Sequence, residues 1–254
     1  MIVYLYDRTF DGILTAVFDA YSRKTFPDAL LGEGEQLPLF CEETHTVITD
    51  EQKAKRVWTA LQKKLSASAL SCLTISYLSE LPELNMPLFR YVCKAVDAPR
   101  SIETNFADED VLMVTNTYRK VIYERQRMLQ FVRFQKAADG TYFSLMEPQY
   151  NVIPLAIEHF KDRFADQPFL LYDKHRDYGY YYDKETLTRV SFAEKLPHFL
   201  TGKLGEGLMA EDEKLFQDLW RTYFKAICIK ERMNPKKQKK DMPVRYWKYL
   251  TEKQ

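Results

Sequence analysis

The chain has 254 residues, of which 46% are hydrophobic and 29% are charged, and its net charge is +1. This balance is typical of a folded protein with one large domain or two modest ones, and it excludes wholesale disorder. No apolar run approaches the roughly 20 residues of a membrane-spanning helix, and the acidic start MIVYLYDRTFDG argues against a signal peptide. We therefore expect a cytoplasmic protein whose four dispersed cysteines stay reduced and mostly buried.

The first half of the sequence alternates short apolar runs with helical periodicity. Residues 2–6 predict a strand, and Asp11 is a candidate cap for a helix from about Gly12 to Lys24. The stretch 27–40 contains two glycines and two prolines and predicts a loop, which precedes a second short strand at 44–48. Further helices are predicted from Thr49-Asp50 to about Leu65, at 67–80, at 84–97 and from Asp108 to about Leu129.

In the second half the pattern changes from helical to extended. The segments 131–136 and 141–146 flank Ala-Ala-Asp-Gly, which predicts a β-hairpin, and Pro154 suits the first turn of a helix to about Phe164. Further strands are predicted at 169–172, 178–182 and 188–192. An amphipathic helix follows at 211–227, and the residues expected on its inner side are Phe216, Leu219, Trp220, Tyr223 and Ile227.

These elements predict an α+β protein. Helices dominate the N-terminal half, an antiparallel sheet lies in the second half, and the C-terminus is helical. No linker is long or polar enough to force two independent domains, so residues 1–254 are predicted to form a single domain. Residues 50–128 are a candidate helical sub-domain within it.

The small net charge conceals a strong segregation. Residues 225–254 carry a net charge of +7 and residues 117–136 carry +5, so the remaining 204 residues sum to −11. Such a division repels an anion over most of a surface and attracts it at one place. The near-zero total is therefore no argument against a polyanionic partner.

Both basic segments interleave their charges with aromatic residues. Basic side chains neutralise phosphates, and planar side chains stack on bases or anchor the segment. The alternative for a basic tail is a role in solubility or loose docking on the protein itself. We predict that residues 117–136 and 230–249 contribute to one continuous positive face that binds DNA. The candidate binding residues are Arg119, Arg127, Arg133, Lys236, Lys237, Arg245 and Trp247.

Evidence for catalysis is weaker. The chain contains no GxxxxGK[ST], GxGxxG, GxSxG or HExxH pattern, and we expect no metal and no cofactor. Glu147, His159 and Asp173 could assemble into a general acid/base site, but we favour the simpler interpretation of a solvated helix face with ordinary ion pairs. The tyrosine-rich strand 178–182 is either a buried core strand or a platform on which bases stack.

Several motifs resemble a bacterial family of proteins assigned to DNA metabolism or repair and described as a domain of unknown function. The likeness covers essentially the whole chain and departs at Arg8, where the family pattern usually has glycine. The most specific piece is the C-terminal motif, Met242–Glu252. The other motifs are Tyr6–Gly12, Met128–Phe134, Glu147–Tyr150, His159–Phe164, Gln167-Pro168, Tyr172-Asp173, Arg176–Gly179, Tyr181–Asp183, Leu219–Phe224 and Arg232–Pro235.

The resemblance implies a DNA-repair setting without an assigned activity. Genes of this family typically neighbour a radical-SAM protein of DNA modification or repair, and some members are fused to a uracil-DNA-glycosylase-like domain. We therefore expect a nucleic-acid-binding accessory protein that acts with a radical-SAM partner. The alternatives are a nuclease-like or glycosylase-like hydrolase acting on damaged DNA, and a protein–protein adaptor without nucleic-acid contact.

Overall fold

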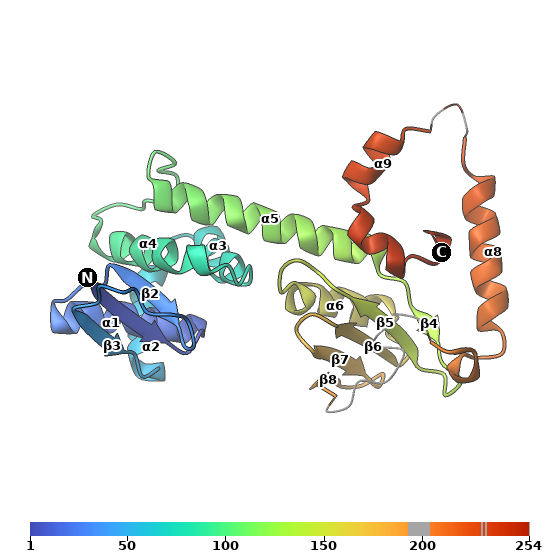
Figure 1. Ribbon diagram of the computed structural model, residues 1–254, viewed down its shortest axis with the longest axis horizontal. Coiled ribbons are helices and arrows are strands. Elements are labelled where there is room, and N and C mark those ends of the chain that lie inside the picture. The colour runs from blue at the N-terminus through green and yellow to red at the C-terminus, as the bar shows by residue number, and fades with distance from the viewer. Residues whose placement is uncertain (193–203, 230, 232, 254) are drawn as a thin grey trace. The chain divides into compact units, whose positions relative to one another are not determined.

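The computed structural model describes residues 1–192, 204–229, 231 and 233–253, and the chain forms two compact units, Met1–Ile122 and Tyr123–Gln254. Figure 1 shows the elements of each unit. Both units combine helices with a sheet, so the α+β class is confirmed. The helix α5 (Glu109–Phe131) contains the boundary between the two units.

The first unit contains a three-stranded parallel sheet. Its strands are β1 (Ile2–Tyr6), β2 (Ala29–Gly32) and β3 (Glu43–Thr46), in the order β2-β1-β3. The two strands predicted at 2–6 and 44–48 are present. The strand β2 lies inside the stretch 27–40, where the loop prediction is wrong because glycine and proline flank a short apolar run, Ala-Leu-Leu, that pairs with β1.

The first unit also contains helices, and side-chain caps define where several of them begin. They are α1 (Phe10–Arg23), α2 (Glu51–Gln62), α3 (Ala67–Tyr77), α4 (Asn85–Asp97) and the first part of α5. Of these helices, α1 and α4 contact the sheet. The Asp50 side chain accepts a hydrogen bond from the Lys53 amide, as expected of an N-cap. The cap predicted at Asp11 is wrong, because Thr9 accepts from the Gly12 amide at 2.9 Å.

The turn between β1 and α1 explains the opening motif. Asp7 Oδ1 accepts hydrogen bonds from the amide and the hydroxyl of Thr9, at 3.0 and 2.7 Å. A Cβ on Gly12 would lie 2.4 Å from this oxygen, so a side chain there would displace the carboxylate. Arg8 has φ of +57°, a left-handed conformation that glycine adopts with less strain. The glycine expected here from the resemblance would therefore fit this turn with less strain.

The second unit contains a five-stranded mixed sheet. Its strands, in both chain and sheet order, are β4 (Gln135–Lys136), β5 (Tyr142–Met146), β6 (Phe169–Asp173), β7 (Tyr178–Tyr182) and β8 (Leu187–Val190). The hairpin predicted around Ala-Ala-Asp-Gly is present between β4 and β5. The prediction of an antiparallel sheet is wrong at β5 and β6, which pair in parallel because α6 (Ile153–Arg163) connects them as a crossover.

Short helices follow the sheet of the second unit. They are the 3₁₀ turn η2 (Glu206–Leu208), the helices α8 (Glu213–Ala226) and α9 (Pro235–Asp241), and the 3₁₀ turns η4 (Val244–Tyr249) and η5 (Thr251–Lys253). The helix α8 packs against η5. Its predicted inner side is wrong: Phe216, Leu219, Tyr223 and Ile227 are each more than half exposed. Amphipathic spacing shows that a helix has an apolar face, but it does not show which surface covers that face.

Candidate functional site

The helix α9 carries the densest exposed positive charge of the second unit. Asn234 caps its N-terminus, and Pro235 occupies the first turn, where its missing N–H has no consequence. Lys237 pairs with Asp241 at 3.3 Å on the same helix. The other lysines are exposed and form no ion pair with any described residue: Lys236, Lys239 and Lys240. Their charge is free to meet an anion from solution.

The C-terminal motif behaves differently, because it packs into the second unit. Tyr246, Tyr249 and Leu250 are buried. The Trp247 indole Nε1 donates to the Met242 carbonyl oxygen at 3.0 Å, and the Lys253 ammonium lies 4.9 Å from the centre of the Trp247 ring. The predicted binding residue Trp247 therefore holds the motif in place in the structure.

A buried carboxylate, that of Glu124 on α5, organises this region. It is 1% exposed, and its Oε1 accepts hydrogen bonds from the Gln149 amide at 2.8 Å and from the Tyr246 hydroxyl at 2.5 Å. Its Oε2 pairs with Arg245, and the Arg127 guanidinium lies 3.5 Å away. A buried charge is tolerated only when partners of this kind replace water. Two predicted DNA-binding arginines are thus the counter-charges of one buried acid.

Arg133 serves a second buried carboxylate. Its Nη2 lies 2.7 Å from Glu252 Oε1, and the Glu252 side chain is 1% exposed. The Trp220 indole donates to Glu252 Oε2 at 2.9 Å. Burial would raise the pKa of Glu252, but the hydrogen bonds from Arg133 and Trp220 outweigh it and hold that pKa below its usual range. This pair joins the end of the C-terminal motif to the region between α5 and β4.

Glu147, His159 and Asp173 do not converge. Asp173 is fully buried and pairs with Arg176 Nη1 at 2.9 Å, and burial raises the pKa of its carboxyl. Glu147 pairs with Lys248, and Lys174 lies 3.5 Å away. His159 is exposed on α6, and its ring centre lies 5.8 Å from that of Phe160. Among the described residues, no hydrogen bond links this histidine to either acid.

A sequence profile described as a domain of unknown function (DUF4130) matches residues 82–252, about two thirds of the chain. This chain belongs to that family. No curated protein and no solved structure matches it. The DUF4130 range contains all seven predicted binding residues and both buried ion-pair centres, whereas the opening motif lies outside it.

One predicted binding residue of the DUF4130 range belongs to the first unit. Arg119 lies on α5, is exposed and forms no ion pair with the residues that the structure describes. It lines a cavity of about 390 Å³ that also contains Cys72, Glu103 and Tyr118. The single continuous face predicted for residues 117–136 and 230–249 stays a prediction, because its residues belong to both units. Arg232, in one of the resemblance motifs, lies outside the described residues.

The tyrosines of β7 divide between the core and the surface. Tyr178 and Tyr182 are buried, and the Tyr182 hydroxyl donates to the Lys184 carbonyl oxygen at 2.7 Å. Arg189 on the neighbouring strand β8 lies 4.5 Å from the centre of the Tyr178 ring. Tyr181 points to the other face and is 36% exposed. One face of this strand is therefore core, as both interpretations require, and the stacking platform stays a prediction for the face that carries Tyr181.

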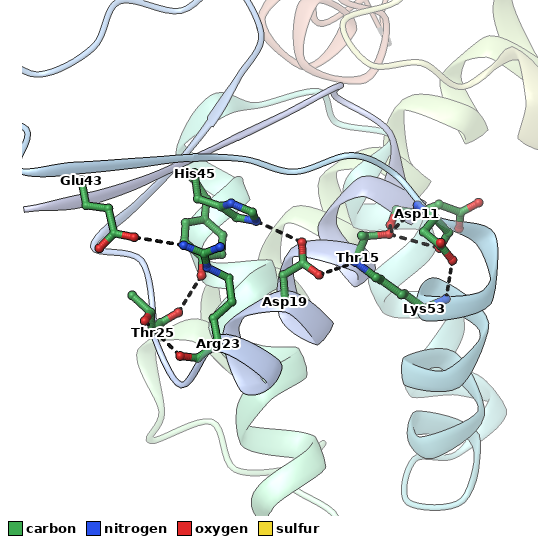
Figure 2. A network of polar contacts seen from close by, with 10 residues as sticks. Asp11, Thr15, Asp19, Arg23, Thr25, Glu43, His45 and Lys53 are labelled. Atoms are coloured by element: carbon green, nitrogen blue, oxygen red, sulfur yellow. Dashed lines mark hydrogen bonds and ion pairs between the residues drawn. The ribbon is translucent and has the colours of Figure 1, made fainter.

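Outside the DUF4130 range, a polar cluster in the first unit was not expected from the sequence. Figure 2 shows the Asp19 carboxylate of α1 between His45 of β3 and Lys53 of α2. The distances are 3.0 Å to His45 Nε2 and 2.8 Å to Lys53 Nζ. Burial alone would raise the pKa of Asp19, but the hydrogen bonds from Lys53 and His45 outweigh this effect and hold that pKa below its usual range. The cluster ties the sheet to two helices.

Sequence reasoning also missed Glu124 and Glu252. A signal for Glu124 was present, because Val121, Glu124 and Met128 follow one another at helical spacing and all three are buried. An acid on an apolar stripe indicates a buried charge that needs a cationic partner. Glu252 offered no comparable periodicity, because it lies in the 3₁₀ turn η5.

The described residues include all four cysteines of the chain. Their four cysteines are free, but only Cys93 is buried and Cys228 is exposed, so the expectation of mostly buried thiols is wrong. No described group of three or more His, Cys, Asp or Glu residues is placed to hold a metal ion. No described helix is long and apolar enough to cross a membrane.

Proposed function

We propose that this protein is a cytoplasmic nucleic-acid-binding accessory protein of DNA repair or modification that acts with a radical-SAM partner. The observation that carries the binding proposal is the exposed, largely unpaired lysine cluster of α9. The proposal concentrates the phosphate contacts there, because Arg127, Arg133 and Arg245 already neutralise buried acids. The repair setting and the radical-SAM partner rest on the family resemblance.

The test is a fluorescence-anisotropy titration of single-stranded and duplex oligonucleotides at several salt concentrations. If the four α9 lysines neutralise about four phosphates, the slope of log K against log salt is about −3.6 for duplex DNA. Replacement of Lys236, Lys237, Lys239 and Lys240 by glutamine should flatten this slope and abolish most of the binding. Full-strength binding by the quadruple variant would contradict the assignment to α9.

A matched control separates local charge from total charge. Lys55 and Lys63 on the first unit are exposed, like Lys239 and Lys240. The Lys55→Gln/Lys63→Gln variant and the Lys239→Gln/Lys240→Gln variant lose the same charge, and only the second should weaken DNA binding. Equal weakening by both would indicate a non-specific electrostatic effect.

A second candidate function, a protein adaptor, is favoured by the exposed apolar face of α8. Phe216, Leu219 and Tyr223 lie at helical spacing and are 58%, 54% and 54% exposed. Contiguous exposed apolar surface of this kind marks protein interaction sites. The Phe216→Ser/Leu219→Ser variant should weaken binding to the purified radical-SAM protein and leave DNA binding unchanged. An unchanged affinity for that protein would remove α8 as its docking surface.

The hydrolase alternative has the weakest support. His159 is exposed on α6, and the buried Asp173 is paired with Arg176. A general base needs an orienting partner and a concave site. Release of base or cleaved strand from damaged oligonucleotides, lost in His159→Ala while binding persists, would make this protein an enzyme.

A further inference from the structure

The cavity beside Arg119 in the first unit has the chemistry of a ligand site. Its volume is about 390 Å³, within the range of small-molecule pockets. Aromatic residues line it from three different segments: Tyr91 on α4, Phe106 in the loop before α5, and Tyr118 on α5. Phe106 is 48% exposed. Planar side chains around a pocket of this size favour a planar ligand.

Glu103 supplies an acceptor on the wall of the cavity. Its Oε2 accepts hydrogen bonds from the amide and the hydroxyl of Ser66, at 3.1 and 2.9 Å, and these bonds fix the carboxylate at the start of α3. Its Oε1 has no hydrogen bond with the described residues. A fixed carboxylate oxygen of this kind recognises an N–H donor, such as the exocyclic amino group of a base.

Arg119 supplies the opposite charge in the same cavity. It does not pair with Glu103 or with another described residue, so its guanidinium is available to an anion. Guanidinium groups bind phosphate through paired N–H donors. The cavity therefore combines an acceptor, aromatic walls and a separate cation.

We propose that this cavity binds a single nucleotide whose base carries an exocyclic amino group, with the amino group at Glu103 and the phosphate at Arg119. This inference rests on the proposed function, because the nucleotide would be one unit of a DNA strand bound by the protein. Thymine and uracil lack the amino group, and their one donor on the base-pairing edge, N3–H, lies between two carbonyl oxygens that the Glu103 carboxylate would repel. Cytosine, adenine and guanine nucleotides are therefore preferred.

Calorimetric titration of the full chain with dAMP, dCMP, dGMP and TMP tests the proposal. The amino-bearing nucleotides should bind about tenfold or more tightly than TMP, which corresponds to one lost base contact. A nucleotide should bind the parent protein more tightly than its nucleoside does, and Arg119→Gln should remove this advantage in affinity. Lys120→Gln, which loses the same charge from the adjacent exposed residue outside this cavity, should leave that advantage intact.

Two further variants test the two halves of the site separately. Glu103→Gln keeps an oxygen for Ser66 and adds an amide donor, so it should erase the discrimination against TMP. Cys72 also lines the cavity, and burial raises the pKa of its thiol to about 11 although Thr115 and Arg119 act in the opposite direction. In a Cys41→Ser/Cys228→Ser background, bound dCMP should slow the alkylation of Cys72.

The outcomes separate this proposal from the DNA-binding proposal. The quadruple α9 variant should lose oligonucleotide binding and keep its affinity for dCMP. Oligonucleotide binding through α9 without any nucleotide binding would contradict the nucleotide site in the cavity and leave the DNA-binding proposal intact. Nucleotide binding with oligonucleotide affinity that is insensitive to α9 would overturn the assignment to α9 alone. Equal affinity for all four nucleotides, or binding of free tryptophan in their place, would contradict the role of Glu103.

Discussion

The lysines of α9 and the arginines around the C-terminal motif differ in what lies beside them. Lys236, Lys239 and Lys240 are surrounded by solvent. Arg245 and Arg133 lie against carboxylates that are 1% exposed. Equal charge in the sequence thus corresponds to two physical roles, because a cation beside a buried acid is neutralised locally, whereas an exposed one contributes to the field that an anion meets.

Removing a buried acid should have the largest effect. Glu124→Ala leaves Arg245, Arg127 and the Tyr246 hydroxyl without their acceptor. Loss of one partner from a buried ion pair costs about 3–5 kcal/mol, and we expect this decrease in the free energy of unfolding by urea denaturation. Glu158→Ala, at an exposed position of α6, is the control. Similar stabilities for both variants would mean that Glu124 organises nothing.

Removing the charge of the second buried acid, Glu252, should lower the free energy of unfolding by a smaller amount. Glu252→Gln keeps the shape of the side chain but removes the charge that Arg133 and Trp220 recognise. Hydrogen bonds to charged groups contribute about 1.5–3 kcal/mol, and a loss in this range is expected. An Arg133→Gln/Glu252→Gln double variant should be less destabilised than the sum of the two single variants. Strict additivity would contradict direct coupling between these residues.

Acidification should weaken the ion pair between Arg133 and Glu252. The folded-state pKa of Glu252 lies below its usual range, so its contribution is fully present above the ordinary glutamate pKa of about 4.3 and is lost as the pH falls through the folded value. The stability difference between the parent protein and Glu252→Gln should therefore be constant near neutral pH and shrink in acid. A difference that grows in acid would contradict the sign of this shift.

The α9 lysines should matter least for stability. Single substitutions of Lys236, Lys239 or Lys240 by glutamine should change the free energy of unfolding by no more than about 0.5 kcal/mol, the usual range at exposed positions. The same substitutions should weaken DNA binding. A large loss of stability would break the contrast between the two basic regions, because it would reveal a structural role for α9.

Local signals in the sequence located most elements but not their partners. The cap at Asp50, the hairpin between β4 and β5, and the helix that begins near Pro154 each follow from a few adjacent residues. The parallel pairing of β5 with β6 and the exposure of the α8 face depend on contacts between distant segments. Strand direction is set by the crossover, and no periodicity inside a strand records it.

The candidate site shows the same limit. Charge and composition identified the basic segments, yet Arg133 and Glu252 are 119 positions apart, and Arg245 and Glu124 are 121 apart. Pairs at such separations leave no local pattern in one sequence. The lysines of α9 were recognisable because a short run with four positive charges and one acid cannot neutralise itself.

The left-handed conformation of Arg8 has a consequence for the engineering of this chain. Codons for glycine and arginine differ by a single nucleotide change, so one point mutation can replace Arg8 by glycine. Arg8→Gly removes the left-handed strain, which costs on the order of 1 kcal/mol for a residue with a Cβ. It gives up an exposed ion pair with Glu35 and the contact of the Arg8 side chain with Gly32. The substitution Arg8→Gly should therefore raise the melting temperature without altering either basic region.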